Sequence, residues 1–386
     1  MHTPTLRRSV RTGLALIASA CLLASCQNPD NRPAEETSAT TPEASASHSP
    51  TSSEPTTAEA TETSATESEG PRATAEGHVV VLSTGGTIAS THDKTGAVVP
   101  TVTGSKLVEP LSGTFDKDKL TLEVKDIAKL DSSAMTLDDT DTIIEAVNKE
   151  LQRDDVDGVV VTHGTDSMEE TAIAVDTFQD SDKPVALTGA MRPFDDPDPD
   201  GPDNLALAVK TVTDPSNKGR GTFIAFADHV IPARGAFKSD TTKADGFANN
   251  NGKKQPQRPK ALKFKPLGNT RVDIIAAYPG APADLIQRSL DSGAEGIVIE
   301  GMGAGNIGDE LAQAAKAAAK KVPVVLTTRV DHGPVEGIYG GAGGGATLAD
   351  AGVISSGTLR APQARMLLAA AITTGTDAED LFAHAE

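Results

Sequence analysis

The chain contains no tryptophan, two tyrosines and nine phenylalanines among its 386 residues. This scarcity removes the aromatic platforms on which proteins usually stack sugars or bases. Positive charge is also in the minority, because 35 Lys and Arg stand against 54 Asp and Glu, a formal net charge of −19. An acidic surface repels phosphate groups. These shortages argue against nucleic acid and anionic lipid as partners.

Cysteine is almost absent, and its two occurrences lie near the N-terminus as Cys21 and Cys26. Three arginines precede an apolar run from Leu14 to Leu23, too short to span a membrane, which predicts a secretory signal over residues 1–25. The L-A-S-C ending resembles a bacterial lipobox and implies cleavage before Cys26 with lipid on its sulfur. A plain secretion signal with an incidental cysteine is the alternative. Removal of Cys21 leaves no partner for an intrachain disulfide.

Composition divides the rest of the chain into a tether and two domains. Residues 26–76 are rich in Ser, Thr, Glu, Ala and Pro without apolar periodicity, so we expect a disordered tether. Strands alternate with helices over 77–258 and again over 272–386, and residues 259–271 form a linker. The predicted fold is α/β, with a doubly wound, mainly parallel sheet in the large N-terminal domain and a smaller C-terminal α/β domain. The protein is predicted to be exported and held on the outer face of the cytoplasmic membrane, or secreted.

Two junctions between a strand and a turn carry hydroxyl side chains. The apolar run from His78 to Leu82 leads into two glycines and Thr87. A run of three valines leads into a turn with Thr165 and Asp166, and Ser167 with Glu170 predicts a capping box that starts a helix at the next residue. Ligands bind at such carboxyl ends of strands in open α/β sheets.

These junctions lie within longer motifs that resemble a known family. T-G-G-T-I-A from Thr84 and H-G-T-D-S-M-E-E-T-A from His163 are similar to the paired threonine signatures of the bacterial L-asparaginase family. The two motifs are long and independent of each other. The match continues through G-A-M-R-P at Gly189, D-G-P-D-N-L at Asp200 and S-G-T-L at Ser356.

The resemblance implies hydrolysis of L-asparagine to L-aspartate and ammonia, without metal or cofactor, in a homotetramer that is a dimer of dimers. Lys238 matches the family's catalytic lysine because it lies four residues after an arginine. By the same resemblance, Asn306 reaches the site of a neighbouring subunit. The implied catalytic residues are Thr87, Thr165, Asp166 and Lys238, and the implied substrate-binding residues are Ser132, Ser133, Asp166 and Asn306.

Amide hydrolysis needs a nucleophile, a base that activates it and donors for the oxyanion. The resemblance makes Thr87 the candidate nucleophile and joins Thr165, Asp166 and Lys238 in a hydrogen-bonded triad. Asp166 would also pair with the α-ammonium group of the substrate. Which threonine forms the acyl-enzyme stays open at this point.

Two departures from the family pattern concern activity and selectivity. The family's loop tyrosine has no counterpart within residues 92–103, and the glutamate supplied by an adjacent subunit is unmatched in Ile338-Tyr339-Gly340-Gly341. The first departure affects activation of the nucleophile, and the second affects the preference for asparagine over glutamine. A minor glutaminase activity is therefore included in the prediction. The alternative function is a surface lipoprotein that binds an amino acid with little or no turnover.

A second motif suggests a different class of protein. Gly303 to Gly308 spells G-x-G-x-x-G between an expected strand and helix, and Asp331 lies where a dinucleotide-binding fold places an acid. This reading explains neither threonine motif, so we do not adopt it. His163 is expected to be held by hydrogen bonds in its turn, and the histidine spacings give no zinc pattern.

Overall fold

A computed structural model describes residues 75–251 and 258–383 of the chain. The predicted signal peptide and nearly all of the predicted tether lie outside these residues. The last two residues of the predicted tether differ from expectation. Ala75 is buried in the core of the large domain, and the carboxylate of Glu76 lies 2.6 Å from the Lys119 ammonium group.

The large domain is built on one six-stranded sheet with the strand order β4-β1-β5-β6-β7-β8. All neighbouring pairs are parallel except β7 and β8, as the sequence predicted for a mainly parallel sheet. The strands are β1 (Gly77–Gly85), β4 (Leu120–Leu130), β5 (Gly158–Thr162), β6 (Val185–Thr188), β7 (Thr222–Phe226) and β8 (His229–Pro232).

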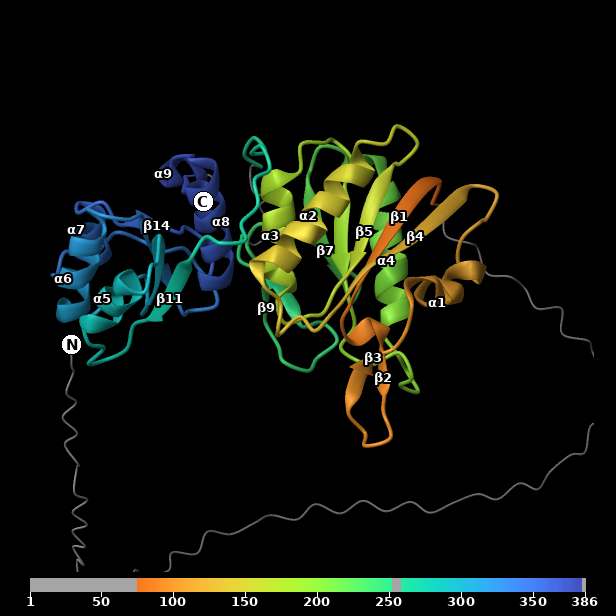
Figure 1. Cartoon of the computed structure of the whole chain (residues 1–386), viewed down its shortest axis with the longest axis horizontal. Helices are drawn as coiled ribbons and strands as arrows, with labels where there is room; N and C mark the ends of the chain where they lie inside the picture. The colour runs from red at the N-terminus through yellow and green to blue at the C-terminus, as the bar shows by residue number, and fades with distance from the viewer. Residues whose placement is uncertain (1–74, 252–257, 384–386) are drawn as a thin grey trace, which may run out of the picture. The chain divides into compact units, whose positions relative to one another are not determined.

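Helices cover both faces of this sheet, which explains why its central strands read as continuous apolar runs. Val159 and Val161 pack into the same cluster as residues of α2 and α3, whereas Val160 packs into the cluster of α1 and α4 on the opposite face (Figure 1). The helices are α1 (Gly104–Val108), α2 (Leu137–Leu151), α3 (Met168–Phe178) and α4 (Gly201–Thr213).

The C-terminal domain contains a four-stranded parallel sheet in the order β11-β12-β13-β14. Helices α5 and α6 pack on one face, and α8 packs on the other, where it also contacts α3 of the large domain. The two-domain α/β fold is therefore confirmed. The elements are β11 (Val272–Ala276), α5 (Asp284–Asp291), β12 (Gly296–Gly301), α6 (Asp309–Ala318), β13 (Val324–Thr328), α7 (Gly345–Ala349), β14 (Ile354–Ser355), α8 (Ala361–Thr374) and α9 (Ala378–Phe382).

The sequence missed α8 and several short strands. Helix α8 is buried over most of its surface, so it lacks the polar face that would reveal a helical period. Lys238 belongs to a short hairpin of β9 and β10 that the sequence analysis did not predict. The remaining elements of the large domain are η1 (Thr87–Ala89), β2 (Ser90–His92), β3 (Val98–Pro100), η2 (Glu109–Gly113), η3 (Pro215–Asn217), β9 (Ala236–Lys238) and β10 (Phe247–Asn249).

The strand order places a topological switch point between β1 and β5. From β1 the chain continues to β4 on one side, and from β5 it continues to β6 on the other. Crevices at the carboxyl ends of such a strand pair are the usual ligand sites of open α/β sheets. Here the register pairs Leu82 with Val161 and Ser83 with Thr162. The turns that follow β1 and β5 therefore begin side by side.

Candidate active site

Thr87 and Thr165 each follow a glycine, and those two glycines touch. A Cβ atom on Gly86 would lie 2.4 Å from the backbone nitrogen of Gly164 and 2.5 Å from its Cα. Gly86 also has a φ of 80° and a ψ of −179°, a backbone conformation that is essentially restricted to glycine. The close approach brings the two threonine-bearing turns together, although 78 positions separate them in the sequence.

Lys238 reaches the second of these turns from the β9–β10 hairpin. Its Nζ donates hydrogen bonds to Thr165 Oγ1 at 2.9 Å and to Asp166 Oδ1 at 2.8 Å. The structure thus forms the hydrogen-bonded group of threonine, aspartate and lysine that the resemblance implied. Thr165 is buried, whereas the Asp166 side chain keeps 57% of its surface exposed and can face a ligand.

Ser132 lies against the same turn. Its Oγ accepts a hydrogen bond from the Asp166 backbone N–H at 3.3 Å, and a Cβ atom on Gly164 would lie 2.3 Å from that oxygen. The structure therefore brings Ser132 to the site. Ser133 is exposed and its hydroxyl donates to Asp131 at 2.8 Å, and it makes no hydrogen bond to Thr165, Asp166 or Lys238 among the described residues.

The predicted capping box at the start of α3 is wrong. Ser167 is the N-cap residue and the helix begins at Met168 as expected, but the side chain of Ser167 makes no capping bond. Its hydroxyl donates instead to the backbone carbonyl of Ser132 at 2.7 Å. The serine links two loops of the site, because its hydroxyl donates to a distant carbonyl and accepts no hydrogen bond from an N–H group of the helix.

Glu169 belongs to the site's support and was not singled out from the sequence. Its Oε2 accepts a hydrogen bond from the backbone N–H of Lys238 at 2.5 Å, and its backbone carbonyl accepts one from Gln363 Nε2 at 3.1 Å. Glu169 is 8% exposed as a residue, and burial raises the pKa of its carboxyl group to about 7. An acidic residue on the core face of α3 was the available signal.

This pKa predicts a dependence of stability on pH. The folded protein holds the Glu169 proton more tightly than the unfolded chain, whose glutamate titrates near 4.5. Its contribution to the free energy of unfolding therefore falls as the pH rises from about 4.5 to about 7. We expect Glu169→Gln, which keeps an acceptor for Lys238, to gain roughly 3 kcal/mol relative to the wild type between pH 5 and 8, or about 6–10 °C in melting temperature.

Melting curves of both proteins across this pH range test the expectation, and Glu145→Gln on the exposed side of α2 is the control. The difference in melting temperature between variant and wild type is the informative quantity, because His163 changes the pH dependence of stability in the opposite direction and is present in both proteins. Burial lowers the pKa of His163 to about 4, so its contribution to stability rises between pH 4 and 6.5. A constant difference between Glu169→Gln and the wild type would contradict the assigned pKa.

His163 occupies the structural position that the sequence predicted. Its Nδ1 lies 2.7 Å from the Gly164 carbonyl and its Nε2 lies 3.0 Å from Thr171 Oγ1. The ring is completely buried, and burial keeps it neutral at physiological pH. It holds the shape of the turn between β5 and α3.

Asn306 lies at the carboxyl end of β12 in the C-terminal domain. Its backbone pairs with Met302, and its side-chain Oδ1 is buried without a hydrogen-bond partner among the described residues. No hydrogen bond joins Asn306 to Thr87, Thr165 or Lys238 in the described parts of the chain. The G-x-G-x-x-G sequence around it forms the turn between β12 and α6, where Gly303 and Gly305 have positive φ.

The segment that lacks the family tyrosine forms the β2–β3 hairpin. His92 ties this hairpin to the loop after β6, because its Nδ1 and its backbone N–H lie 3.0 and 2.9 Å from the two carboxylate oxygens of Asp195. Tyr339 is 53% exposed and belongs to a loop of the C-terminal domain. The hairpin therefore has a fixed anchor but no aromatic hydroxyl.

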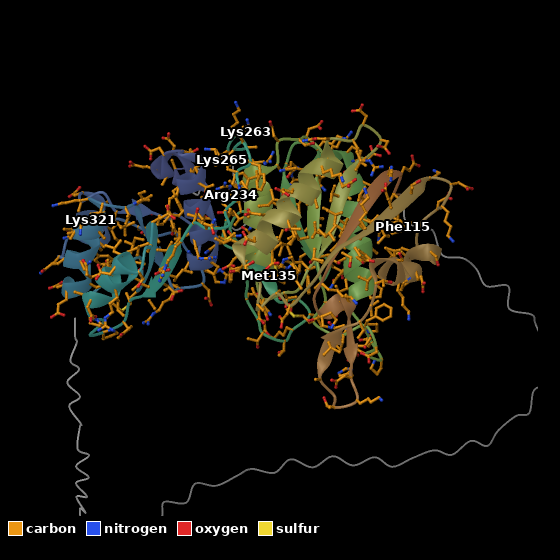
Figure 2. The ribbon with its side chains drawn as sticks, viewed as in Figure 1. Phe115, Met135, Arg234, Lys263, Lys265 and Lys321 are labelled. Carbon is orange, nitrogen blue, oxygen red and sulfur yellow. The ribbon has the colours of Figure 1, made fainter. Side chains whose placement is uncertain are left out.

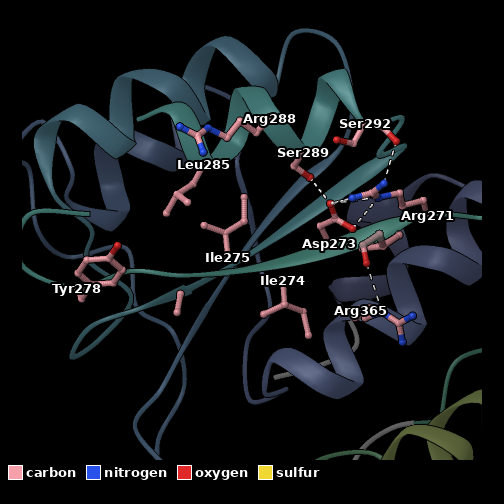
Figure 3. A pocket seen from close by; sticks show the side chains of 12 residues that line it. Arg271, Asp273, Ile274, Ile275, Tyr278, Leu285, Arg288, Ser289, Ser292 and Arg365 are labelled. Atoms are coloured by element: carbon pink, nitrogen blue, oxygen red, sulfur yellow. Dashed lines mark hydrogen bonds and ion pairs between the residues drawn. The ribbon is translucent and has the colours of Figure 1, made fainter. Parts of the chain in front are cut away.

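One cavity adjoins the candidate site, and a larger one does not. One of about 270 Å³ adjoins Asp166 and contains Ser132 and Ser133, with Glu170 and Arg365 on its wall. A larger hollow of about 720 Å³ lies along β11 and α5 of the C-terminal domain and contains none of the predicted site residues (Figure 3). Volume therefore does not single out the cavity beside Asp166, since another of about 730 Å³ next to Phe178 also exceeds it.

Within the described residues, no group of three or more His, Cys, Asp or Glu side chains is placed to hold a metal ion. A search of the same residues for a helix with the length and apolar character of a membrane span finds none.

The fold and the site define a two-domain α/β protein in which hydroxyl, ammonium and carboxylate groups meet at the topological switch point. A family model described as Asparaginase, N-terminal matches residues 78–259, and one described as Glutaminase/Asparaginase C-terminal domain matches residues 271–383. The chain belongs to the asparaginase/glutaminase family.

Individual proteins of known name agree with this assignment. The chain is 32% identical over 327 residues to L-asparaginase 2 of Bacillus subtilis, covering 80% of this chain and 85% of that protein. It is 34% identical over 341 residues to L-asparaginase 2 of Escherichia coli, covering 80% and 92%. The crystal structure of a probable cytoplasmic L-asparaginase from Campylobacter jejuni superposes with a TM-score of 0.68 at 29% identity, covering 80% of this chain and 99% of that one.

Proposed function

We propose that the protein hydrolyses L-asparagine to L-aspartate and ammonia through a threonine nucleophile. The observation that carries this proposal is the position of Lys238, whose Nζ bonds to both Thr165 and Asp166 beside the turn that bears Thr87. A hydroxyl, a basic group that can take its proton and an exposed carboxylate are the parts that amide hydrolysis of an amino acid requires.

In the proposed reaction, Thr87 Oγ attacks the side-chain amide carbon of the substrate. Its proton passes by way of the Thr165 hydroxyl and Lys238 Nζ to the leaving nitrogen, so the C–N bond breaks and ammonia departs. Water then attacks the resulting ester and restores the threonine. Asp166 pairs with the α-ammonium group, and Ser132 bonds to the α-carboxylate. Backbone N–H groups beyond Gly86 stabilise the oxyanion, because the Gly86 N–H is already bonded to the Leu130 carbonyl.

Ammonia release from asparagine by the purified protein is the direct test, and absence of release would refute the proposal. Glutamine is expected to be the poorer substrate, and equal kcat/KM values for the two amides would contradict that expectation.

The hairpin without a tyrosine favours one second candidate, an amino-acid-binding lipoprotein. Calorimetry that shows asparagine bound but never consumed would select it.

Replacement of Lys238 by methionine tests the proton relay. We expect kcat/KM for asparagine to fall at least about a hundredfold, because the group that takes the proton is lost. Folding should survive, since the ion pair with Asp166 is partly exposed and Glu169 contacts only the lysine backbone. Lys243→Met is the matched control, because that ammonium group is exposed and pairs with Asp240. Comparable losses in both variants would overturn the role of Lys238.

We further propose that the protein acts outside the cytoplasm, anchored through lipid on Cys26 and joined to its domains by the tether. Residues 77–258 and 272–386 would be the two functional domains, linked by 259–271. We also propose assembly into a homotetramer in which Asn306 completes the site of a partner. Light scattering after gel filtration tests the assembly, and mass spectrometry of the membrane fraction tests the lipid.

A further inference from the structure

A small pocket of the large domain gathers three arginines around one aspartate. The pocket has a volume of about 10 Å³, and Arg220, Arg234 and Arg258 line it together with Asp176 and Thr222. Arg234, which is labelled in Figure 2, lies in the turn between β8 and β9, four residues before Lys238. An arginine cluster of this kind is unusual in a chain with a net charge of −19.

Arg234 is the member without acceptors. The residue is 2% exposed, and its Nε, Nη1 and Nη2 are all buried with no hydrogen-bond partner among the described residues. The nearest carboxylate oxygen, Asp176 Oδ2, lies 3.7 Å from Nε, which is beyond hydrogen-bonding distance. A guanidinium group stays charged in proteins and has five N–H donors to satisfy. Such a buried, unsatisfied charge requires a partner.

Asp176 is already committed to other groups. Its Oδ1 accepts from the Thr222 backbone N–H at 3.1 Å and from Arg258 Nε at 3.2 Å. Arg220 donates to Asn217 at 2.7 Å and lies over the Phe223 ring. Arg234 and Arg258 therefore share one carboxylate, which leaves one positive charge of this pair without compensation among the described residues.

The Arg234 side chain cannot easily move away from the pocket, because the backbone around it is fixed. Gln363 of α8 bonds to the residues on either side, accepting from the Gly235 N–H at 2.9 Å and donating to the Ala233 carbonyl at 2.6 Å. The Arg234 carbonyl accepts from the side chains of Asn249 and Asn251. The N–H groups of Arg234 therefore remain directed into the cluster.

We propose that this cluster binds one small monovalent anion of halide size, with chloride as the physiological species. An anion accepts several N–H donors at once and compensates a positive charge, whereas a water molecule supplies no charge. Inside a protein the effective dielectric constant is low, so the attraction between the anion and the guanidinium groups is stronger than it would be in water. The cavity holds about one water-sized sphere, which excludes sulfate and phosphate. The bound anion fixes the turn that leads into β9, and hence the strand that carries Lys238.

Thermal unfolding in chloride tests the proposal without reference to enzymatic activity. We expect the wild-type melting temperature to be about 2–4 °C higher in sodium chloride than in sodium gluconate when chloride exceeds its dissociation constant about tenfold. Both solutions are kept at an ionic strength of about 0.15 M, so that screening is equal. Arg234→Met should abolish the difference. Arg271→Met is the control, because that arginine is exposed and pairs with Asp273, and it should retain the difference.

A crystal of the wild-type protein grown in sodium bromide gives a second measurement that does not depend on a variant folding. Anomalous scattering from bromide should appear between Arg234 and Arg258. Equal melting temperatures in the two salts, or a cavity that holds only water in the bromide crystal, would overturn the proposal. Neither result would affect the proposed hydrolysis of asparagine, since neither experiment measures it.

Discussion

Thr165→Val should reduce kcat/KM for asparagine about a thousandfold or more while leaving the protein folded. Valine has nearly the shape of threonine, so the buried position after β5 stays filled. The substitution removes the hydroxyl that accepts the Lys238 hydrogen bond, and with it the path of the proton. General acid–base groups of this kind contribute about a hundredfold to ten-thousandfold. Steady-state ammonia release measures the loss.

Thr142→Val on the exposed side of α2 is the matched control and should keep full activity. Thr87→Val should be at least as inactive as Thr165→Val, because it removes the proposed nucleophile. Covalent trapping distinguishes the two roles, since an acyl group should be found on the peptide that contains Thr87. A fully active Thr165→Val protein, or an acyl group on Thr165, would contradict the proposed division of roles.

The largest loss of stability is expected for Gly86→Ala. The substitution adds a Cβ 2.4 Å from the Gly164 nitrogen, which is a backbone atom that cannot rotate away, and it forces alanine into a conformation reserved for glycine. We expect a destabilisation of at least about 3 kcal/mol and a fall in melting temperature of about 6–12 °C. Activity should be lost even below this melting temperature, because the turns of Thr87 and Thr165 must separate.

Gly96→Ala isolates the steric part of this effect. Gly96 has a similar φ of 84°, but a Cβ there would meet nothing within 4 Å. Its cost should be limited to the backbone strain of about 1–2 kcal/mol, with activity retained. Thermal unfolding and ammonia release of the two variants are compared directly. If both alanines cost the same, the contact between Gly86 and Gly164 has no special importance.

Much of the fold was predictable because the central strands are covered on both faces. The valine run of β5 shows this pattern, and the helix after it begins at Met168 as predicted. Helix α8 was missed for the related reason that burial on all sides removes its periodic pattern. The hairpin of β9 and β10 was missed because three-residue strands give almost no signal, so no strand was predicted at Lys238.

The two threonines and Lys238 were identified from sequence motifs, but their supporting residues were not. Glu169 contacts Lys238 and Gln363 contacts the turn before its strand, across 69 residues and more. No local pattern in the sequence encodes such a contact. The prediction that Ser167 caps α3 failed in the same way, because its hydroxyl bonds to Ser132 across 35 residues.

By itself, the sequence determined that the protein is a two-domain α/β chain with hydroxyl-bearing turns after two buried strands, because strand burial and turn chemistry are local properties. Tertiary structure decided that these turns meet. The parallel pairing of β1 with β5 aligns their carboxyl ends, and two glycines without side chains let the backbones touch. Tertiary packing also brings Lys238 to Thr165 across 73 residues. It likewise buries Arg234 without an acceptor among the described residues.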